Sequence, residues 1–461
     1  MSGSSTPARD RPAEAGRAAR GAVLTVYVTA MCMNGLDATI VNPALFSIAA
    51  DLGVGPAAAN LVEGSFLASL AVSMPVAGWL CDRYGAARVF LAALALFTAA
   101  SALCGLAWNL DSLVGFRVLQ GVGGGVLTPA GMTMLFTAYA PEERMRLSRY
   151  IVVPTALAPA LGPVLGGLLA DHLSWRWAFH LNVPFGVAAV LLGLAAVRVP
   201  SPGAGAAGRF DLRGLLLAAS GFGLLMYGLG EAAAGGWASP WVIAALAAGA
   251  VLTALLVPAE RTAASPLLDL RPLADRGFLR GAAAASLAAA GLMGMLFVFP
   301  LMYQDALGAS ASEAGLVVFP EALGLMAAGF AVDRVCARWG ERRVTALGLL
   351  GGAALFTVLA LAAPGPWALR AIMFSVGLVL GHAVTAVQIS AFDGVGPEVM
   401  GRAMTLFQSL RMLGGALGVG VCALAVAAGY PAALLVSAAF LAAAFLAAVL
   451  LTPAAVVARA G

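Results

Sequence analysis

The sequence lacks lysine altogether, and charged residues of any kind are scarce. Of its 461 residues, 10% are charged and 61% are hydrophobic, and the mean hydropathy is +0.94. This composition lies far outside the range of water-soluble domains. The 26 basic residues are all arginine, and the formal net charge is only +4. Because no basic stripe with interleaved aromatic residues exists outside short loops, we expect no nucleic-acid partner.

Cysteine and catalytic clusters are sparse too. The five cysteines stand singly, mostly inside apolar runs, so neither a disulfide framework nor a metal site is expected, and we expect no cofactor. A phosphate-binding P-loop needs a lysine, so its absence excludes that route to nucleotide-driven work. A membrane-embedded enzyme or sensor would need a polar catalytic cluster or an appended soluble domain, and the sequence shows neither. We therefore expect that the chain is not an enzyme.

Long apolar segments are what the chain has in abundance. A bilayer core needs about 20 apolar residues per helix, and helices satisfy their own backbone hydrogen bonds in lipid. Fourteen such segments are predicted, at 22–46, 61–81, 88–107, 112–138, 147–172, 177–197, 212–230, 238–258, 278–302, 312–335, 343–362, 367–391, 401–427 and 431–452.

The arginines test this count independently. All but four of the 26 fall in tails or loops that the count places on the cytoplasmic side, as positive-inside charge requires. The four others are Arg117, Arg176, Arg370 and Arg411. We therefore predict a multi-pass protein of the cell inner (cytoplasmic) membrane with both termini in the cytoplasm.

Two cytoplasmic loops indicate an internal repeat. GWLCDRYGAAR at 78–88 and DRVCARWGERR at 333–343 follow the second and tenth predicted helices. The predicted fold is all-α, with two six-helix inverted-repeat bundles, two inserted central helices and a site near the membrane midplane. The predicted units are a disordered cytoplasmic tail at 1–21, a bundle at 22–197, the inserted pair with its loops at 198–276, a bundle at 277–452 and a cytoplasmic tail at 453–461.

The loop residues support two interpretations. One is ordinary positive-inside charge. The other is conformational switching, in which Asp82 and nearby arginines latch the halves together on the cytoplasmic side in one state. The candidate switching residues are Gly78, Asp82, Arg83, Gly85 and Asp333.

Ionisable residues inside predicted spans are the strongest functional signal, because each costs about 2.5 to 3.5 kcal/mol on insertion scales. Asp37, Glu63 and Arg117 are predicted in the outer half of the membrane. Asp37 could carry protons or contact substrate, or it could form a static ion pair with Arg117. Glu63 has the same functional interpretation, with an interfacial carboxylate in water as the alternative.

The second half carries its own acid. Glu321 interrupts the tenth predicted helix near the midplane, as a cation-binding or proton-carrying carboxylate would. Its expected partner is Arg411 in the thirteenth helix, at similar depth.

The fifth predicted helix is rich in glycine and proline. Gly162, Pro163, Gly166 and Gly167 clear one face and weaken the backbone hydrogen bonding. With the glycine run at 121–126 of the fourth helix, they are predicted to form a gating seam.

Together these stretches resemble the major facilitator superfamily, specifically its fourteen-helix drug and proton antiporter branch, over nearly the whole chain. The resemblance rests on LDATIVNPAL in the first helix, GWLCDRYGAAR in the loop, RVLQGVGGG in the fourth helix, GPVLGG in the fifth and WRWAFHLNVPFG at the start of the sixth.

The resemblance implies roles for particular residues. Asp37 and Arg117 would serve proton coupling or substrate recognition, Asp82 and Arg83 conformational switching, and the glycines from Gly162 onward the antiport seam. Glu63, Glu321 and Ala337 depart from the family pattern, and such acids often accompany cationic substrates in this branch.

The expected function is proton-coupled efflux of small amphipathic or cationic drug-like compounds by alternating access. The alternative is a dedicated exporter or importer of a single metabolite or natural product, including self-resistance. Expected partners are the substrate, protons and the lipid bilayer. We expect a monomer, and the sequence leaves an adaptor protein undecided.

Overall fold

The structure, a computed structural model, describes residues 11–139, 141–196, 210–233, 239–362, 365–396 and 399–449. Every regular element in these ranges is helical. The elements are α1 (Arg11–Ile40), η1 (Asn42–Ala44), α2 (Leu45–Asp51), η2 (Pro56–Ala59), α3 (Asn60–Tyr84), α4 (Ala86–Gly105), α5 (Leu110–Ala138), α6 (Pro141–His172), α7 (Trp177–His180), α8 (Asn182–Ala196), α9 (Leu212–Glu231), α10 (Pro240–Thr262), η4 (Arg271–Ala274), α11 (Arg276–Leu307), α12 (Ala311–Trp339), α13 (Glu341–Leu361), α14 (Pro366–Phe392), α15 (Met400–Val426) and α16 (Tyr430–Val449).

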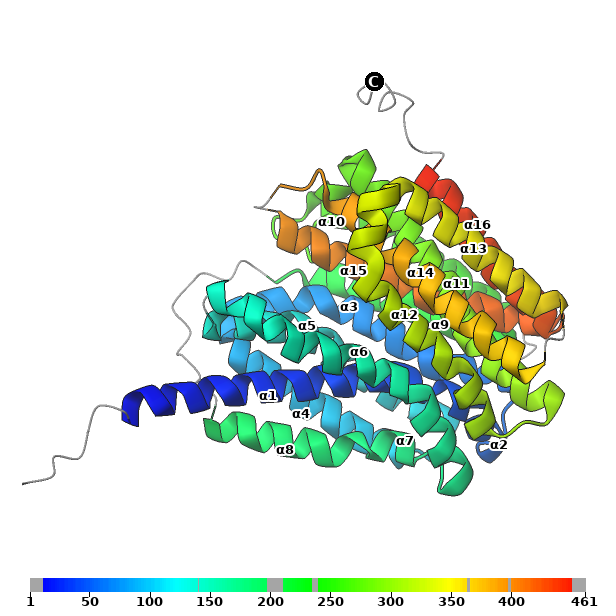
Figure 1. Cartoon of the computed structure of the whole chain (residues 1–461), viewed down its shortest axis with the longest axis horizontal. Coiled ribbons are helices and arrows are strands. Elements are labelled where there is room, and N and C mark those ends of the chain that lie inside the picture. The colour runs from blue at the N-terminus through cyan, green and yellow to red at the C-terminus, as the bar shows by residue number, and fades with distance from the viewer. Residues whose placement is uncertain are drawn as a thin grey trace, which may run out of the picture.

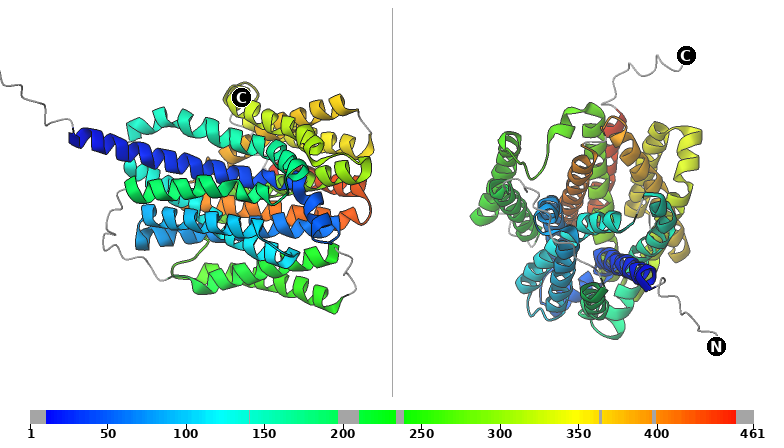
Figure 2. Two further views of the ribbon diagram at one scale, coloured as in Figure 1. Left: turned by 90° about the horizontal axis from the view of Figure 1, so that it is seen from below. Right: turned by 90° about the vertical axis from the view of Figure 1, so that its left-hand side faces the viewer.

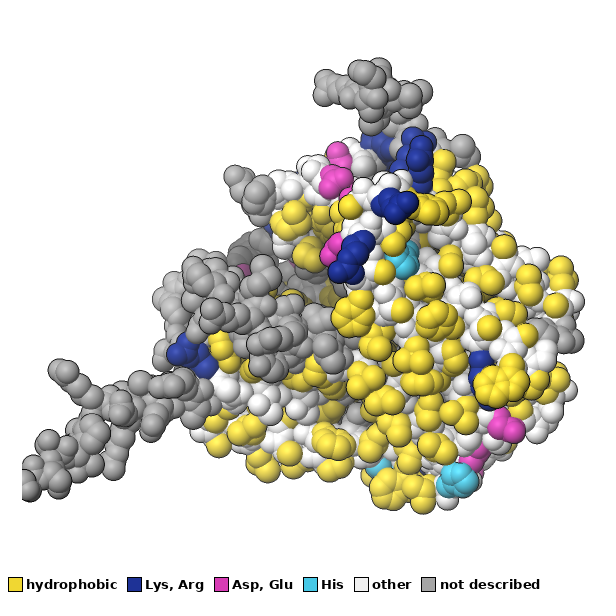
Figure 3. Space-filling view, viewed as in Figure 1, with side chains coloured by type: hydrophobic (Ala, Val, Ile, Leu, Met, Phe, Trp, Pro, Cys, Tyr) yellow, Lys and Arg dark blue, Asp and Glu magenta, His cyan; other side chains and the backbone are white. Residues whose placement is uncertain are grey.

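Twelve stretches within the described residues are long and apolar enough to cross a membrane. The helices α5 and α6, of 29 and 32 residues, lie where two further spans are predicted but are not among the twelve. Both are longer than the roughly 20 residues that a bilayer core requires. Hydrophobic side chains cover the middle of the surface in Figure 3, and charged ones gather towards its edges, as expected of a lipid-facing protein.

The helices form two groups that lie side by side (Figure 1). Helices α1 to α8 make one group and α11 to α16 the other, and they meet mainly where α6 contacts α12 and α3 contacts α15. The pair α9 and α10 packs together at one side of the molecule (Figure 2). Because α9 contacts both α3 and α15, the pair lies against the boundary between the two groups.

The two groups are fastened at the end where α6 finishes and α12 begins. The carboxylate of Asp171 accepts hydrogen bonds from the backbone N–H groups of Ala311 (3.1 Å) and Ser312 (2.7 Å). Beside it, Gln304 of α11 donates to the carbonyl oxygen of Pro43 at 2.9 Å. In Figure 1 the groups diverge from this end towards the opposite one, where α1 begins.

The two echoing loops have the same backbone. Gly85 and Gly340 adopt positive φ angles of 85° and 78°, and each separates two antiparallel helices. Their N–H groups donate to the carbonyl oxygens of Cys81 and Cys336. A residue with a Cβ rarely adopts such a φ, which explains a glycine at both positions.

The start of the chain differs from the prediction of a disordered tail at 1–21, because α1 begins at Arg11. Residues 11–20 contain mostly alanine, arginine and glutamate, which are strong helix formers and extend the first span. The rest of that tail, the tail at 453–461 and the loop at 198–209 lie outside the described residues.

Candidate functional site

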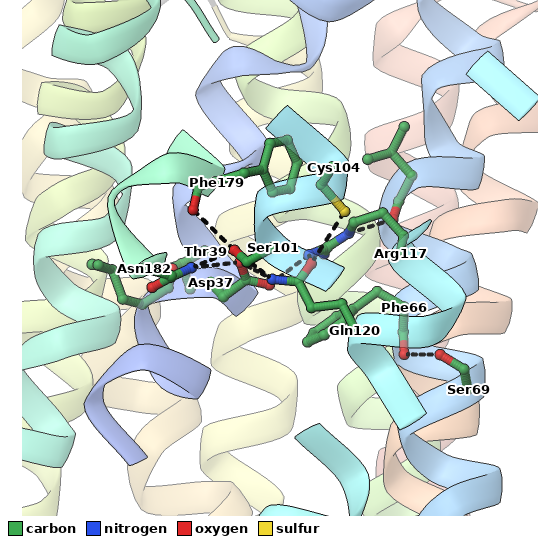
Figure 4. A network of polar contacts seen from close by, with 12 residues as sticks. Asp37, Thr39, Phe66, Ser69, Ser101, Cys104, Arg117, Gln120, Phe179 and Asn182 are labelled. Atoms are coloured by element: carbon green, nitrogen blue, oxygen red, sulfur yellow. Dashed lines mark hydrogen bonds and ion pairs between the residues drawn. The ribbon is translucent and has the colours of Figure 1, made fainter. Parts of the chain in front are cut away.

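Asp37 lies at the centre of a buried polar network drawn from four helices (Figure 4). Its side chain is fully buried in α1 and accepts from Arg117 Nη1 at 2.5 Å, Gln120 Nε2 at 2.8 Å and Asn182 Nδ2 at 3.1 Å. Ser101 of α4 joins the network by accepting from Gln120 at 3.1 Å and from Asn182 at 3.3 Å. The three donors, one of them cationic, satisfy both oxygens of the buried side chain.

Arg117 is only 1% exposed and is held on several sides. Its Nε donates to the carbonyl oxygen of Val62 at 3.1 Å, and its guanidinium carbon lies 4.0 Å from the centre of the Phe66 ring. Buried cations are tolerated when paired, hydrogen-bonded and stacked in this way. The predicted association of Asp37 with Arg117 is therefore a real ion pair.

The sequence analysis did not identify three members of this network, Gln120, Asn182 and Ser101. Gln120 follows Arg117 by one helical turn, so both side chains leave the same face of α5. Asn182 begins α8 and Ser101 lies on α4. Uncharged polar residues in a membrane helix are common enough that only their convergence on Asp37 distinguishes them.

Glu63 is also buried, at 2% exposed, so it is not an interfacial carboxylate in water. Neither of its carboxylate oxygens has a hydrogen-bond partner within the described part of the chain. The Oδ1 of Asn42, in η1, is likewise buried without a partner. A buried carboxyl group without a hydrogen-bond partner is costly, so Glu63 is a candidate for a functional role rather than a structural one.

Glu321 is 4% exposed in α12, and its Oε1 has no hydrogen-bond partner among the residues described. The expected pairing with Arg411 is not made. Arg411 Nε donates instead to Gln408 Oε1, 2.9 Å away on the same helix. One helical turn separates these two residues of α15, so the local bond forms without any approach of α12.

The glycines of α6 bring three helices into close contact. A Cβ on Gly162 would overlap Thr39, one on Gly166 would overlap the carbonyl oxygen of Ile40, and one on Gly167 would overlap that of Ala311. This helix therefore packs on α1 within its own group and on α12 across the boundary.

Proline adds a second bond to this contact. Pro163 has no N–H, so the carbonyl oxygen of Pro159 loses its helical donor. The hydroxyl of Thr39 donates to that carbonyl at 2.9 Å. A hydrogen bond from α1 thus replaces one that α6 cannot make.

In this state the glycine runs of α5 and α6 do not face each other, so the predicted seam between them is not formed. Cβ atoms on Gly121 and Gly125 would meet α3, and one on Gly123 would meet α4. The glycines of α5 therefore allow α3 and α4, both in the same group, to pack closely against two sides of this helix.

The predicted switching residues lie at the opposite end of the molecule. Gly78, Asp82, Arg83 and Asp333 are exposed, and Gly85 is half-buried. Within the described ranges, Asp82, Arg83 and Asp333 make no hydrogen bond or ion pair, so a latch between the halves is not formed in this state.

Ionisable groups buried inside a bundle of membrane-length helices mark a functional site in a membrane protein. The same fold is found in two solved structures. A crystal structure of the nucleoside transporter NupG matches with a TM-score of 0.68 at 13% identity, covering 94% of this chain and all of that one. A crystal structure of the peptide transporter POT matches with the same TM-score at 16% identity, covering 96% and 94%.

The family follows from the sequence as a whole. The chain belongs to the Major Facilitator Superfamily, whose model matches residues 27–419. A Klebsiella pneumoniae protein provisionally named multidrug resistance protein MdtD is 32% identical over 394 residues, which are 85% of this chain and 83% of that one. The protein of the same name from Salmonella paratyphi B is 36% identical over 344 residues, 73% and 72% of the two chains.

Proposed function

We propose that this chain exports small amphipathic or cationic compounds across the cytoplasmic membrane in exchange for protons, by alternating access. The observation that carries the proposal is the buried pair of Asp37 and Arg117, with its amide donors, in the first helix group. Burying charged side chains in a membrane costs free energy, so their presence there indicates a function.

The coupling step follows from the contacts of Asp37. In the present state its two oxygens accept hydrogen bonds from three donors, one of them the Arg117 guanidinium. A proton on Asp37 would remove the charge that binds Arg117, so α1 and α5 would lose their strongest link. Protonation from one side of the membrane and release to the other can in this way shift the equilibrium between two states.

Glu321 is the proposed cation-binding acid of the second group. It is buried and lacks a partner for Oε1, so a positively charged substrate could supply the missing interaction. Glu63 and Arg411 are proposed as auxiliary members of the same proton and substrate pathway.

The proposed topology has fourteen membrane helices, counting α5 and α6 with the twelve apolar spans. The repeats would be 22–197 and 277–452, with 198–276 inserted, and both termini would be cytoplasmic. The arginine-bearing loops then lie inside, the end fastened by Asp171 lies outside, and the state described is inward-facing. In the outward-facing state Gly78, Asp82, Arg83, Gly85 and Asp333 would latch the halves on the cytoplasmic side.

Substrate breadth is proposed by likeness to the relatives whose names refer to multidrug resistance. Dye efflux tests it. Proteoliposomes that contain the native chain are loaded with a fluorescent lipophilic cation, and efflux is followed under an imposed proton gradient, with and without a protonophore.

The variants Asp37→Asn and Glu321→Gln separate coupling from substrate charge. We expect Asp37→Asn to abolish gradient-driven efflux of every substrate, and Glu321→Gln to reduce that of cations more than that of neutral compounds. Gradient-independent efflux by the native protein would contradict proton coupling. If correctly inserted native protein moves no dye, a dedicated exporter of one metabolite becomes the better proposal.

A further inference from the structure

The inserted pair, α9 and α10, carries two acidic residues where it joins the rest of the chain. One lies at the start of α9 and the other at the end of α10. Asp211 precedes α9, and its Oδ1 accepts from the N–H of Gly214 at 2.8 Å. Glu260 lies in the last turn of α10, only 3% exposed, and its Oε2 accepts from the N–H of Leu268 at 3.0 Å. Each carboxyl group thus uses one oxygen to hold local backbone.

The other two oxygens lie close together beside Gly214. Asp211 Oδ2 and Glu260 Oε1 are both buried without a hydrogen-bond partner in the described structure. A Cβ on Gly214 would overlap both atoms, so the two oxygens crowd the same side of that glycine. Two acceptors cannot bond each other, so a hydrogen or a cation must lie between them for either to be satisfied.

Among the described residues, no positively charged side chain bonds these two oxygens. Arg213 on α9 and Arg261 on α10 are exposed, and neither forms an ion pair within the ranges described. On α3, which packs against α9, Asp82 and Arg83 are exposed and equally unpaired.

The remaining charges come from α15 and the connection before α11. Arg402 of α15 bonds Asp269 at 3.0 Å, and Arg271 lies 3.8 Å from the same acid. Both arginines are therefore engaged by Asp269, and a single proton is the simplest bridge between the pair.

This acid pair is connected to the C-terminal group. Leu268, whose N–H is held by Glu260, is buried among Phe278, Val387 and Phe407. The next residue is Asp269, which holds Arg402. The middle of the 263–275 connection is therefore held to α10 through Glu260 and to the C-terminal group through Leu268 and Asp269.

We propose that Asp211 and Glu260 form a proton-binding site that shares one proton and thereby fastens the 263–275 connection to the inserted pair. With the proton present, the O–H of one acid donates to the carboxylate of the other. Its loss to water leaves two neighbouring carboxylates, whose repulsion releases Glu260 from Leu268. The inserted pair then reports the pH on its own side of the membrane to the C-terminal group, independently of proton-driven transport.

Limited trypsin digestion of the purified full-length protein tests this directly, because Arg261 and Arg276 flank the connection and are both exposed. Trypsin does not cut after Arg271, because Pro272 follows it. Cleavage at the two flanking arginines is divided by cleavage at Arg83 and Arg88, which corrects for the pH dependence of trypsin itself. For the native protein we expect this ratio to rise about tenfold between pH 6.5 and 9, as one bound proton is lost.

Two variants carry the same test. In Glu260→Gln an amide N–H donates to Asp211 at every pH while the amide oxygen still accepts from Leu268, and Asp211→Asn is the reciprocal case. For both, the ratio should change less than about twofold over the same pH range. Glu231→Gln, at the far end of α9, should behave as the native protein does.

A flat ratio in the native protein would overturn the proposal, and so would an equal rise in both amide variants. If millimolar sodium, magnesium or calcium chloride suppresses the rise in the native protein, the site binds a cation and the shared proton is wrong.

Discussion

Asp37 and Arg117 show at the scale of single residues how a membrane protein keeps a charge in its interior. The ion pair alone would leave lone pairs and N–H groups unsatisfied, and Gln120, Asn182 and the carbonyl oxygen of Val62 complete the set. The energy of such a pair depends on both members being present.

Removal of Arg117 should therefore cost more than removal of the whole pair. We expect Arg117→Gln to lower the free energy of unfolding by about 3–5 kcal/mol, because Asp37 is left as an uncompensated buried charge. The double variant Asp37→Asn with Arg117→Gln should regain much of that loss. Thermal unfolding of detergent-purified protein, followed by tryptophan fluorescence, measures both. A double variant less stable than Arg117→Gln would contradict the argument.

The helix α6 is one of the two elements of the first group that join it to the second. Its glycines admit α1 and α12, its proline-freed carbonyl takes a bond from Thr39, and Asp171 at its end binds the first turn of α12. Ser310 satisfies the next N–H of α12, that of Glu313. An acid from one half thus completes the cap of a helix in the other.

Close packing of α6 on α1 makes Gly166 intolerant of any side chain. We expect Gly166→Val to destabilise the protein by about 1–3 kcal/mol or more, since a Cβ would overlap the carbonyl oxygen of Ile40. Gly115→Ala, where nothing lies within 4 Å of the new Cβ, is the matched control and should be neutral or slightly stabilising. Fluorescence-detected size-exclusion after heating compares them, and equal stability of the two variants would refute close packing here.

Asp171 should bias the conformational equilibrium. Loss of a helix-capping acid costs about 1 kcal/mol, so Asp171→Ala should shift the population by roughly fivefold towards a state that is open at this end. Spin labels at Leu173→Cys and Leu307→Cys, in a background without the native cysteines, report the separation of the two halves. Asp111→Ala, an exposed acid on α5, is the control. An unchanged distance distribution in Asp171→Ala would exclude Asp171 as a fastening residue.

On the scale of the whole molecule, the two helix groups meet at one end and diverge at the other (Figure 1). The arrangement suits alternating access, because breaking contacts at one end and making them at the other exposes the same buried site to opposite sides.

Fourteen crossings predict which surface residues face outward. Leu307→Cys and Trp241→Cys should react with a membrane-impermeant maleimide in intact cells, whereas Trp339→Cys should react only after permeabilisation. All three native side chains are exposed, so access to the reagent is not limited by burial. The proposed topology has one crossing, α12, between Leu307 and Trp339, so the two lie on opposite sides of the membrane. Labelling of Trp339→Cys in intact cells would refute that topology.

The sequence predicted the helical class and nearly all the spans, because each span is written locally as a run of apolar residues. It also placed Asp37 and Arg117 in the same half of the membrane and gave their ion pair as one of two alternatives, since a charge in such a run has few means of compensation. It did not predict the uncharged partners of Asp37, Gln120 and Asn182. It also paired Glu321 with Arg411 on similar depth alone, and the structure does not show that contact.

The sequence by itself therefore determined that the chain is a membrane protein and which charges must find partners, because transfer into lipid is a property of each segment. Only the tertiary structure decided which partners they find. The burial of Glu63, the contact of α6 with α1 rather than α5, and the meeting of Asp211 with Glu260 all depend on how helices distant along the chain pack. Such packing sets side-chain contacts that no local pattern records.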